Sequence, residues 1–315
     1  MTPTPEPQSP VDGYVGRFAP TPSGPLHAGS LLAAVISWLD ARSADGEWHL
    51  RIDDIDAPRV RPGAADAILR TLEAFDLGWD GPIVWQGQRG PAYQRALDTL
   101  MDTDRAFPCG CTRKDLATHG RPGWEGPVYP GTCRHGLPPG REPRALRARA
   151  TTRYWAIEDR FLGAVAFDLE ALGGDFVIRR ADGIVAYQLA TVVDDLDLGV
   201  THVVRGIDLL GSTPRQMQLY RALGHPPPAY AHHPVLVAPG GDKLAKATGA
   251  TGIRADAARR HLADTLGQIG LAPSDRQAPD APGAQLAEAL EPLRRRPLAA
   301  YLPLRTTLPG APAAV

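Results

Sequence analysis

One stretch near the start of the chain constrains its fold more than any other. A short apolar run, Tyr14–Phe18, leads into a loop of proline, glycine, serine and threonine, and a run with helical spacing, Leu31–Ala41, follows. This order predicts a strand, a tight loop and a helix whose first turn holds His27 and Gly29. A helix N-terminus offers free N–H groups and partial positive charge, so the loop is a candidate phosphate cradle. An ordinary strand-to-helix turn of a doubly wound domain would have the same pattern.

The composition is that of a globular protein. Hydrophobic residues make up 43% and charged residues 22% of 315 residues, enough chain for two domains or one domain with an insert. No apolar run reaches the roughly 18 residues of a membrane helix, and residues 1–12 are proline-rich without signal-peptide features. We therefore expect a disordered N-terminal tail, a cytoplasmic location and no membrane partner. The net charge of −1 gives no global field for nucleic acid but leaves a local RNA-binding patch open.

Lysine is rare in this chain. The 34 basic residues are nearly all arginine, and lysine occurs only at Lys114, Lys243 and Lys246. The last two lie close together beside glycines, which favours a site that needs a compact ammonium, although chance placement would give the same pattern.

Three carboxylates follow the predicted strand Trp48–Ile52: Asp53, Asp54 and Asp56. Open α/β sheets place their ligands at this end of a strand. The carboxylates could bind a metal or a ligand ammonium, or could cap helices. Asp54 and Asp56 could equally pair with the neighbouring Arg51 and Arg59.

All cysteines lie in one segment rich in glycine and proline: Cys109, Cys111 and Cys133. A Cys-x-Cys pair places two thiolates on one side of a turn, as metal chelation requires, and the third cysteine adds a ligand. Tyr129, His119, His135 or a water could supply the fourth. A redox or catalytic role lacks an evident base, and buried thiols would not cluster so tightly. The pattern therefore favours one structural zinc ion.

Periodicity and turn residues predict the remaining elements. We expect helices over Ala64–Phe75, Ala92–Asp102, Ala186–Val192, Thr213–Leu223, Ala255–Ile269 and Gln285–Arg296. We expect strands over Gly163–Phe167, Phe176–Arg179 and Pro234–Val237, and a strand running into a loop over His202–Asp208. Thr213 and Pro214 have the residue types of an N-cap and first helical position. The arginine-rich stretch Ala145–Tyr154 could be a phosphate-binding surface or a solvated face.

Two segments that are distant in the sequence together resemble the signatures of one enzyme class. Arg17–Ser30 (R-F-A-P-T-P-S-G-P-L-H-A-G-S) and Lys243–Ala247 (K-L-A-K-A) resemble the HIGH-like and KMSKS-like signatures of class I aminoacyl-tRNA synthetases. Together with R-I-D-D-I-D, V-V-D-D and V-V-R-G-I-D, they are similar to the glutamyl branch across residues 14–248. The resemblance implies an α/β fold: a Rossmann-type catalytic domain with a zinc-containing insert and a small C-terminal helical segment.

The segment after the second signature is too short for the helical anticodon-binding region of a full glutamyl-tRNA synthetase. The chain therefore resembles the truncated paralogues of this branch, which use ATP to activate L-glutamate and transfer it to the queuosine base at the wobble position of tRNA(Asp). The resemblance makes a monomer the default. The implied regions are a tail at 1–12, the first catalytic half at 13–105, the zinc insert at 106–185, the second half with its KMSKS-like loop at 186–254, and the helical segment at 255–315.

The resemblance also implies roles for individual residues. Glutamate would be bound by Arg17, Phe18, Ala19, Pro20, Thr21, Asp53, Tyr187 and Arg205. ATP with Mg²⁺ would contact His27, Gly29, Ser30 and Lys246, and the catalytic residues would be His27, Lys243 and Lys246. The zinc ligands would be Cys109, Cys111, Tyr129 and Cys133. Arg205 would face the side-chain carboxylate of glutamate and Asp53 its α-ammonium. Adenylate formation gathers negative charge, which suits a helix N-terminus and mobile cations.

Two departures from the family pattern leave other functions open. Asp53 stands where the family usually has glutamate, and Ala245 where serine is usual. One alternative is a short glutamyl-tRNA synthetase that charges the 3′ end of tRNA(Glu). The other, which these departures favour, is a catalytically inactive paralogue that binds RNA.

Overall fold

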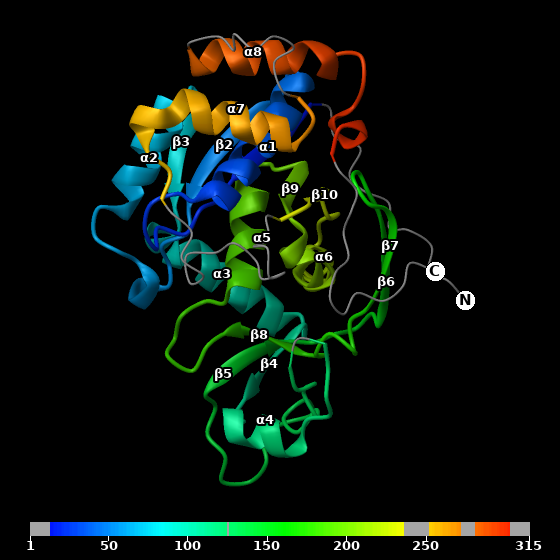
Figure 1. Ribbon diagram of the computed structural model, residues 1–315. Coiled ribbons are helices and arrows are strands. Elements are labelled where there is room, and N and C mark those ends of the chain that lie inside the picture. Colours follow the sequence, from blue (N-terminus) through cyan, green and yellow to red (C-terminus); the bar gives the residue numbers. More distant parts are fainter. Residues whose placement is uncertain (1–12, 125, 236–251, 272–280, 303–315) are drawn as a thin grey trace.

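The computed structural model describes residues 13–124, 126–235, 252–271 and 281–302. The predicted tail at 1–12 and the second signature lie outside these residues. Two sets of parallel strands form the centre of the fold (Figure 1). The first set pairs in the order β1 (Val15–Phe18), β2 (Glu47–Ile52) and β3 (Asp80–Trp85), and the second set pairs β9 (His202–Gly206) with β10 (Ala229–His233).

The two sets meet where β1 lies beside β9. The N–H of Thr201 donates to the carbonyl of Val15 at 2.9 Å, and Arg17 Nη1 donates to the carbonyl of Val204 at 3.4 Å. The partner of Val15 is Thr201, and the partner of Arg17 is Val204, so residue numbers rise in the same direction on both sides. Strands β1 and β9 are therefore parallel. The spatial order is therefore β3-β2-β1-β9-β10, with a topological switch point between β1 and β9, where doubly wound domains bind ligands.

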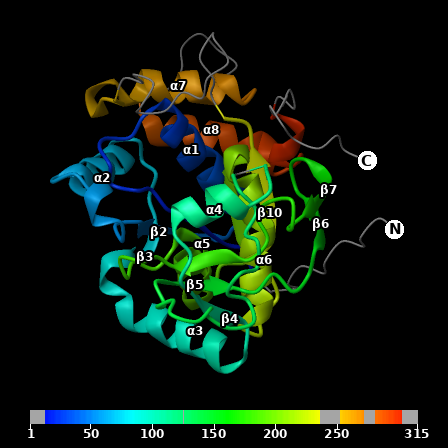
Figure 2. The same cartoon turned by 90° about the horizontal axis from the view of Figure 1, so that it is seen from below.

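Helices cover the strands on both sides (Figures 1 and 2). On one side, α1 (Ala28–Ser43), α2 (Ala64–Ala74), α7 (Ala258–Gln268) and α8 (Pro282–Leu293) share a single apolar core with β1 and β2. A second core joins α3 (Gly90–Asp102), α5 (Tyr187–Asp197) and α6 (Thr213–Ala222). The C-terminal helices are therefore part of the same core as the first half of the chain.

A smaller antiparallel unit lies between the two sets of strands in the sequence. Its sheet has the order β4 (Ala106–Cys109), β5 (Ala145–Ala148) and β8 (Phe176–Arg179). Thr112 and Asp115 form a reciprocal capping box at the start of α4 (Arg113–His119). A hairpin of β6 (Tyr154–Asp159) and β7 (Gly163–Asp168) returns the chain toward β10.

Short 3₁₀ turns connect several elements, at Ala57–Arg59, Gln86–Gln88, Ile207–Ser212, Ala255–Ala257 and Leu298–Ala300. Among the helices of the described ranges, none combines the length and apolar character that a membrane crossing requires.

Most predicted helices and strands are confirmed, but several boundaries were wrong. The N-cap of α6 is Ser212 rather than Thr213, whose hydroxyl instead serves a buried arginine. Strand β10 ends at His233, just before the strand predicted at Pro234–Val237, of which residues 236 and 237 lie outside the described residues. Helix α8 also begins earlier than predicted, because Pro282 occupies its first turn.

The arginine-rich stretch contains strand β5 and ends at the first residue of β6, and neither strand was predicted from the sequence. Arg147 of β5 is buried, and its Nη1 donates to the carbonyl of Asp175 at 2.9 Å. Arg149 donates to the carbonyl of Arg134 at 2.7 Å. Neither arginine matches the expected phosphate surface or solvated face, because both serve as internal braces of the small sheet.

Candidate active site

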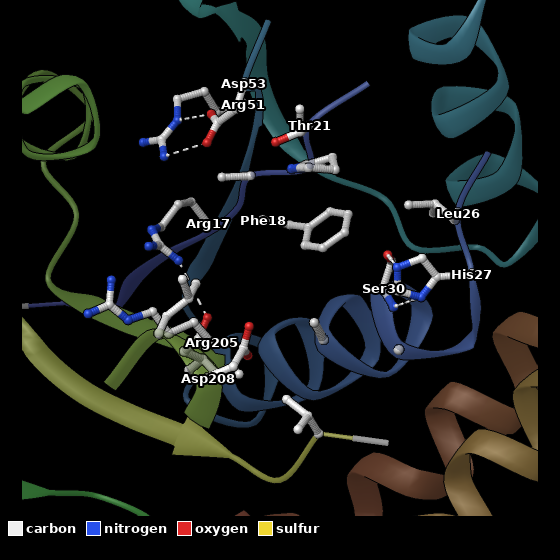
Figure 3. A pocket seen from close by; sticks show the side chains of 18 of the residues that line it. Arg17, Phe18, Thr21, Leu26, His27, Ser30, Arg51, Asp53, Arg205 and Asp208 are labelled. Atoms are coloured by element: carbon white, nitrogen blue, oxygen red, sulfur yellow. Dashed lines mark hydrogen bonds and ion pairs between the residues drawn. The ribbon is translucent and has the colours of Figure 1, made fainter. Parts of the chain in front are cut away.

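A cavity of about 780 Å³ opens where β1 and β9 end, at the switch point of the strand order (Figure 3). Its wall brings together every predicted glutamate- and ATP-binding residue that the structure describes: Arg17, Phe18, Ala19, Pro20, Thr21, His27, Gly29, Ser30, Asp53, Tyr187 and Arg205. The predicted catalytic Lys243 and Lys246 lie outside the described residues. Segments far apart in the sequence therefore form one site.

Buried ion pairs form the base of this cavity. Arg51 Nε donates to Asp53 Oδ1 at 2.7 Å, and Arg51 Nη1 donates to Asp195 Oδ1 at 2.6 Å. Asp195, on α5, also accepts from Arg17 Nε at 3.3 Å. Arg51 pairs with neither Asp54 nor Asp56, which was one of the alternatives left open for these carboxylates. The partners come instead from the end of its own strand and from a helix far along the chain.

The two remaining carboxylates of the R-I-D-D-I-D motif have structural partners. Asp54 Oδ1 accepts the N–H of Gly87 at 2.7 Å, and Asp56 pairs with Arg180 at 3.4 Å. Neither lies in the wall of the cavity. Asp56 does not pair with Arg59, the other alternative left open: Arg59 lines the cavity and forms no ion pair among the described residues.

Asp53 is 9% exposed and faces the cavity beside Arg51. Burial raises the pKa of the Asp53 carboxyl, and the Arg51 guanidinium opposes this shift. On this side of the cavity, the guanidinium groups of Arg17 and Arg51 are matched by the carboxylates of Asp53 and Asp195.

Arg205 has a different electrostatic environment. It is 5% exposed, and its Nε, Nη1 and Nη2 donate to His232 Nε2, Gln216 Oε1 and Thr213 Oγ1 at 3.1, 2.6 and 2.7 Å. In the described part of the chain, no carboxylate lies within ion-pair distance of its guanidinium. Each terminal nitrogen keeps one further N–H. A buried and uncompensated guanidinium in a cavity wall is suited to bind an anion, above all a planar carboxylate.

His27 ends the loop and caps α1. Its backbone is extended, and its Nδ1 accepts the N–H of Ser30 at 3.2 Å. The prediction that His27 and Gly29 lie at the first turn of a helix is confirmed. The cap leaves the first N–H groups of α1 at the cavity, where a helix N-terminus attracts phosphate.

The chain on both sides of residues 236–251 reaches this same cavity. Val235 lines its wall. After the gap, the N–H of Ile253 donates to the carbonyl of Leu26 at 2.8 Å, and Gly252 forms a β-bridge with His27. The first signature and the segment after the second are thus joined by backbone hydrogen bonds.

The cysteines form a separate cluster in the small antiparallel unit. The sulfur atoms of Cys109, Cys111 and Cys133 all lie within 4.8 Å of one another, and the Cys111 and Cys133 sulfurs are 3.7 Å apart. Sulfurs bound tetrahedrally to zinc at about 2.3 Å are about 3.8 Å apart. The separation of the Cys111 and Cys133 sulfurs is therefore the one expected for two ligands of a zinc ion.

The hydroxyl group of Tyr129 lies beside this cluster. Its hydroxyl oxygen lies 3.7 Å from Cys109 Sγ and accepts the N–H of Cys133 at 2.7 Å. Arg147 donates to Cys109 Sγ at 3.4 Å and lies over the Tyr129 ring. Burial opposes the thiolate of Cys109, but hydrogen bonds from Cys111 N–H and Arg147 lower its pKa. In the described structure, the alternative ligands His119 and His135 do not join the group.

Three polar residues of the site had no role in the sequence analysis: Asp195, His232 and Asp159. Asp195 lies in the V-V-D-D motif, which contributed to the family resemblance without a role for either aspartate. The signal at His232 is a pair of histidines in a strand that is otherwise apolar; both are buried. Asp159 gave no signal, because its partner His232 is distant in the sequence.

The sequence is similar to those of known tRNA synthetases. A family model described as tRNA synthetases class I (E and Q), catalytic domain, matches residues 14–276. The Glutamyl-Q tRNA(Asp) synthetase of Chromobacterium violaceum is 54% identical over 260 residues, covering 82% of this chain and 87% of that protein. The protein of the same name from Bordetella bronchiseptica is 52% identical over 273 residues, covering 85% and 86%.

A solved structure shares the fold. The glutamate-tRNA synthetase of Elizabethkingia anophelis superposes with a TM-score of 0.72 at 23% identity, over 87% of this chain. This chain spans 65% of that protein.

Proposed function

The chain belongs to the class I tRNA synthetases of the E and Q group, and we propose that it is a ligase that activates L-glutamate with ATP and transfers it to queuosine in tRNA(Asp). The observation that carries this proposal is the guanidinium of Arg205, buried in the cavity wall without a carboxylate partner among the described residues. The curated relatives, which carry the name Glutamyl-Q tRNA(Asp) synthetase, support the choice of RNA.

In the first step, an oxygen of the glutamate α-carboxylate attacks the α-phosphorus of ATP. A C–O–P bond forms, the bond from that phosphorus to the bridging oxygen of pyrophosphate breaks, and pyrophosphate leaves. Negative charge builds up on the phosphates during this step. The N-terminus of α1, capped by His27, supplies N–H groups and a partial positive charge. Lys246, assisted by Lys243, supplies a cation to the phosphates, and Mg²⁺ accompanies ATP.

Glutamate is held at both of its ends. Arg205 receives the side-chain carboxylate, because its charge is uncompensated and its terminal nitrogens keep N–H groups for a bidentate contact. Asp53 receives the α-ammonium, and Arg17 and Tyr187 line the space between the two ends. Glutamine is rejected, because its neutral amide leaves the buried charge of Arg205 unpaired.

In the second step, a hydroxyl of the queuosine cis-diol attacks the carbonyl carbon of the adenylate. An ester bond forms, the bond from the carbonyl carbon to the phosphate oxygen breaks, AMP leaves, and the hydroxyl proton is released. The 3′ end of the RNA takes no part. An enzyme that charges tRNA(Glu) would use the same first step, so the acceptor of the glutamyl group separates the two functions.

Both steps can be tested separately. Glutamate-dependent exchange of pyrophosphate into ATP, with glutamine as the matched control, tests activation. We expect exchange with glutamate and little with glutamine; no exchange with either would favour the inactive paralogue. Incubation with labelled glutamate and either tRNA(Asp) or tRNA(Glu) tests the acceptor. Label on tRNA(Glu) would contradict the proposed transfer while leaving activation intact.

We also propose that Cys109, Cys111, Tyr129 and Cys133 hold one zinc ion. Three sulfurs within 4.8 Å of one another, with a phenol oxygen 3.7 Å from one of them, are a donor set that zinc accepts. The ion would tie the end of β4 to the loop at residues 129–133, because Cys109 and Cys111 come from the first and Tyr129 and Cys133 from the second. The region boundaries stated from the sequence remain predictions.

A further inference from the structure

Arg205 is held by a histidine on the neighbouring strand. Arg205 of β9 and His232 of β10 are direct partners in the parallel register of these strands. The side chain of His232 is fully buried. Its Nε2 lies 3.1 Å from Arg205 Nε, and its Nδ1 lies 2.6 Å from Asp159 Oδ2. A chain of three buried groups therefore leads from the cavity wall to the end of β6.

The hydrogen bonds of this chain require one tautomer of His232. The Nδ1 proton faces the Asp159 carboxylate, so Nε2 carries a lone pair that accepts from Arg205 Nε–H. Thr213 closes the ring: its hydroxyl accepts from Arg205 Nη2 at 2.7 Å and lies 3.1 Å from His232 Nε2, to which it can donate. Burial lowers the pKa of His232, which keeps the imidazole neutral as this arrangement needs.

Asp159 is itself fixed by the backbone. Its Oδ1 accepts the N–H groups of Phe161 and Leu162, both at 3.0 Å, and that of His232 at 3.2 Å. One carboxylate oxygen therefore holds the turn of the β6–β7 hairpin, while the other orients the imidazole. The position of the Asp159 carboxylate does not depend on any ligand in the cavity.

We propose that Asp159 and His232 are positioning residues for recognition of the glutamate side chain. Asp159 selects the Nδ1–H tautomer of His232, and His232 then fixes the plane of the Arg205 guanidinium, so that its remaining N–H groups meet the carboxylate. This inference rests on the proposed function, which assigns that carboxylate to Arg205.

The variant Asp159→Asn separates this role from that of the turn. Three N–H donors keep the amide oxygen of asparagine at the Oδ1 position, which leaves the NH₂ group facing His232 Nδ1. The imidazole must then carry its proton on Nε2, where it meets the Nε–H of Arg205. Asp168→Asn is the matched control, because Asp168 ends the same hairpin and its Oδ1 accepts the N–H groups of Glu170 and Ala171 at 3.0 and 3.2 Å.

The measurements are glutamate binding by calorimetry and steady-state ATP–pyrophosphate exchange. For Asp159→Asn we expect the glutamate Kd and KM to rise about 10-fold or more, with the KM for ATP nearly unchanged. The preference for glutamate over glutamine should fall as well. Asp168→Asn should change none of these values. His232→Phe, which keeps a ring but removes the acceptor, should act in the same direction as Asp159→Asn.

Two outcomes would overturn the inference. One is wild-type glutamate affinity in folded Asp159→Asn. The other is an equal loss for glutamate and ATP that follows the loss of folding stability, because this would indicate a structural role alone. If wild type binds glutamate without catalysing exchange, the proposed function fails, and the Kd values of the variants still decide the inference. No binding by wild type contradicts both.

Discussion

Arg51 and Asp195 form a buried ion pair between the end of β2 and the helix α5. The Arg51 Nη1 and Asp195 Oδ1 atoms are 2.6 Å apart, and each residue is 1% exposed. Asp195 also accepts from Arg17, so one carboxylate orients two arginines of the cavity. The pair therefore joins β2 to α5 beside the cavity, which Arg51 lines.

Replacing Asp195 with alanine is expected to destabilise the fold strongly. The change leaves two buried guanidinium groups short of a counterion, which typically costs about 3–5 kcal/mol. Urea denaturation would measure this loss in the free energy of unfolding. The control is Asp197→Ala on the same helix, because the side chain of Asp197 is 53% exposed, where its ion pair is worth about 1 kcal/mol or less. Equal effects of the two variants would contradict the central role of Asp195.

Replacing Arg205 with lysine should weaken glutamate activation. An ammonium cannot form a bidentate contact with a carboxylate while keeping the bonds to His232 and Gln216. We expect kcat/KM for glutamate in pyrophosphate exchange to fall about 10- to 100-fold. Arg294→Lys is the control, because the side chain of Arg294 is 65% exposed and pairs only weakly with Glu291. An unchanged kcat/KM in Arg205→Lys would show that Arg205 does not bind the side-chain carboxylate of glutamate.

The cavity could largely be predicted from the sequence, because its residues lie in ordered motifs that end strands or begin a helix. The partners of those residues could not. Arg51 has acidic neighbours in the sequence, yet it pairs with Asp195 on α5, and only the folded chain brings that helix close. Likewise, His232 sits in a strand that was predicted too late, because two adjacent histidines favour a polar segment, although both are buried.

The small antiparallel unit was the least predictable part. Its arginines indicate solvent or RNA by composition, but Arg147 packs over Tyr129 and braces β5. Strand β3 was also missed, because Gly81 and Pro82 are typical of a turn and the strand is only partly buried. Such elements are set by tertiary pairing rather than by local periodicity.

The cysteine cluster makes a prediction about metal content. Purified protein should contain close to one zinc per chain by elemental analysis, and Cys133→Ser should lose it and unfold at a lower temperature. Tyr129→Phe removes the oxygen donor but keeps the ring beside Phe107 and under Arg147. We expect the Tyr129→Phe variant to retain its zinc. A chelator should remove that zinc faster than it removes zinc from the wild-type protein. Wild-type protein without zinc, isolated in the absence of chelators, would contradict the zinc site.

His202 gives a pH dependence of stability. Burial, together with the nearby Arg160 charge, lowers the pKa of His202 to about 4 from 6.5. Between these two pKa values, His202 binds a proton in the unfolded chain but not in the folded chain. The free energy of unfolding is therefore highest above about pH 6.5 and falls as the pH drops toward 4. His202→Phe keeps the stacking on Tyr14 and removes the titration.

Unfolding free energies at about pH 7.5 and about pH 5 test this prediction. The decrease between the two values should be smaller in His202→Phe than in wild type. His225→Gln, which changes an exposed histidine, should retain the wild-type decrease. A decrease in His202→Phe equal to that of wild type would show that His202 does not take up the proton.

The destination of the activated glutamate is tested most directly by the chemistry of its acceptor. The protein is incubated with ATP, labelled glutamate and tRNA(Asp) that either carries or lacks queuosine, before and after periodate oxidation of the RNA. We expect label only on the queuosine-containing tRNA, and loss of that label when periodate has cleaved the cis-diol. Label on tRNA(Asp) without queuosine would contradict the account.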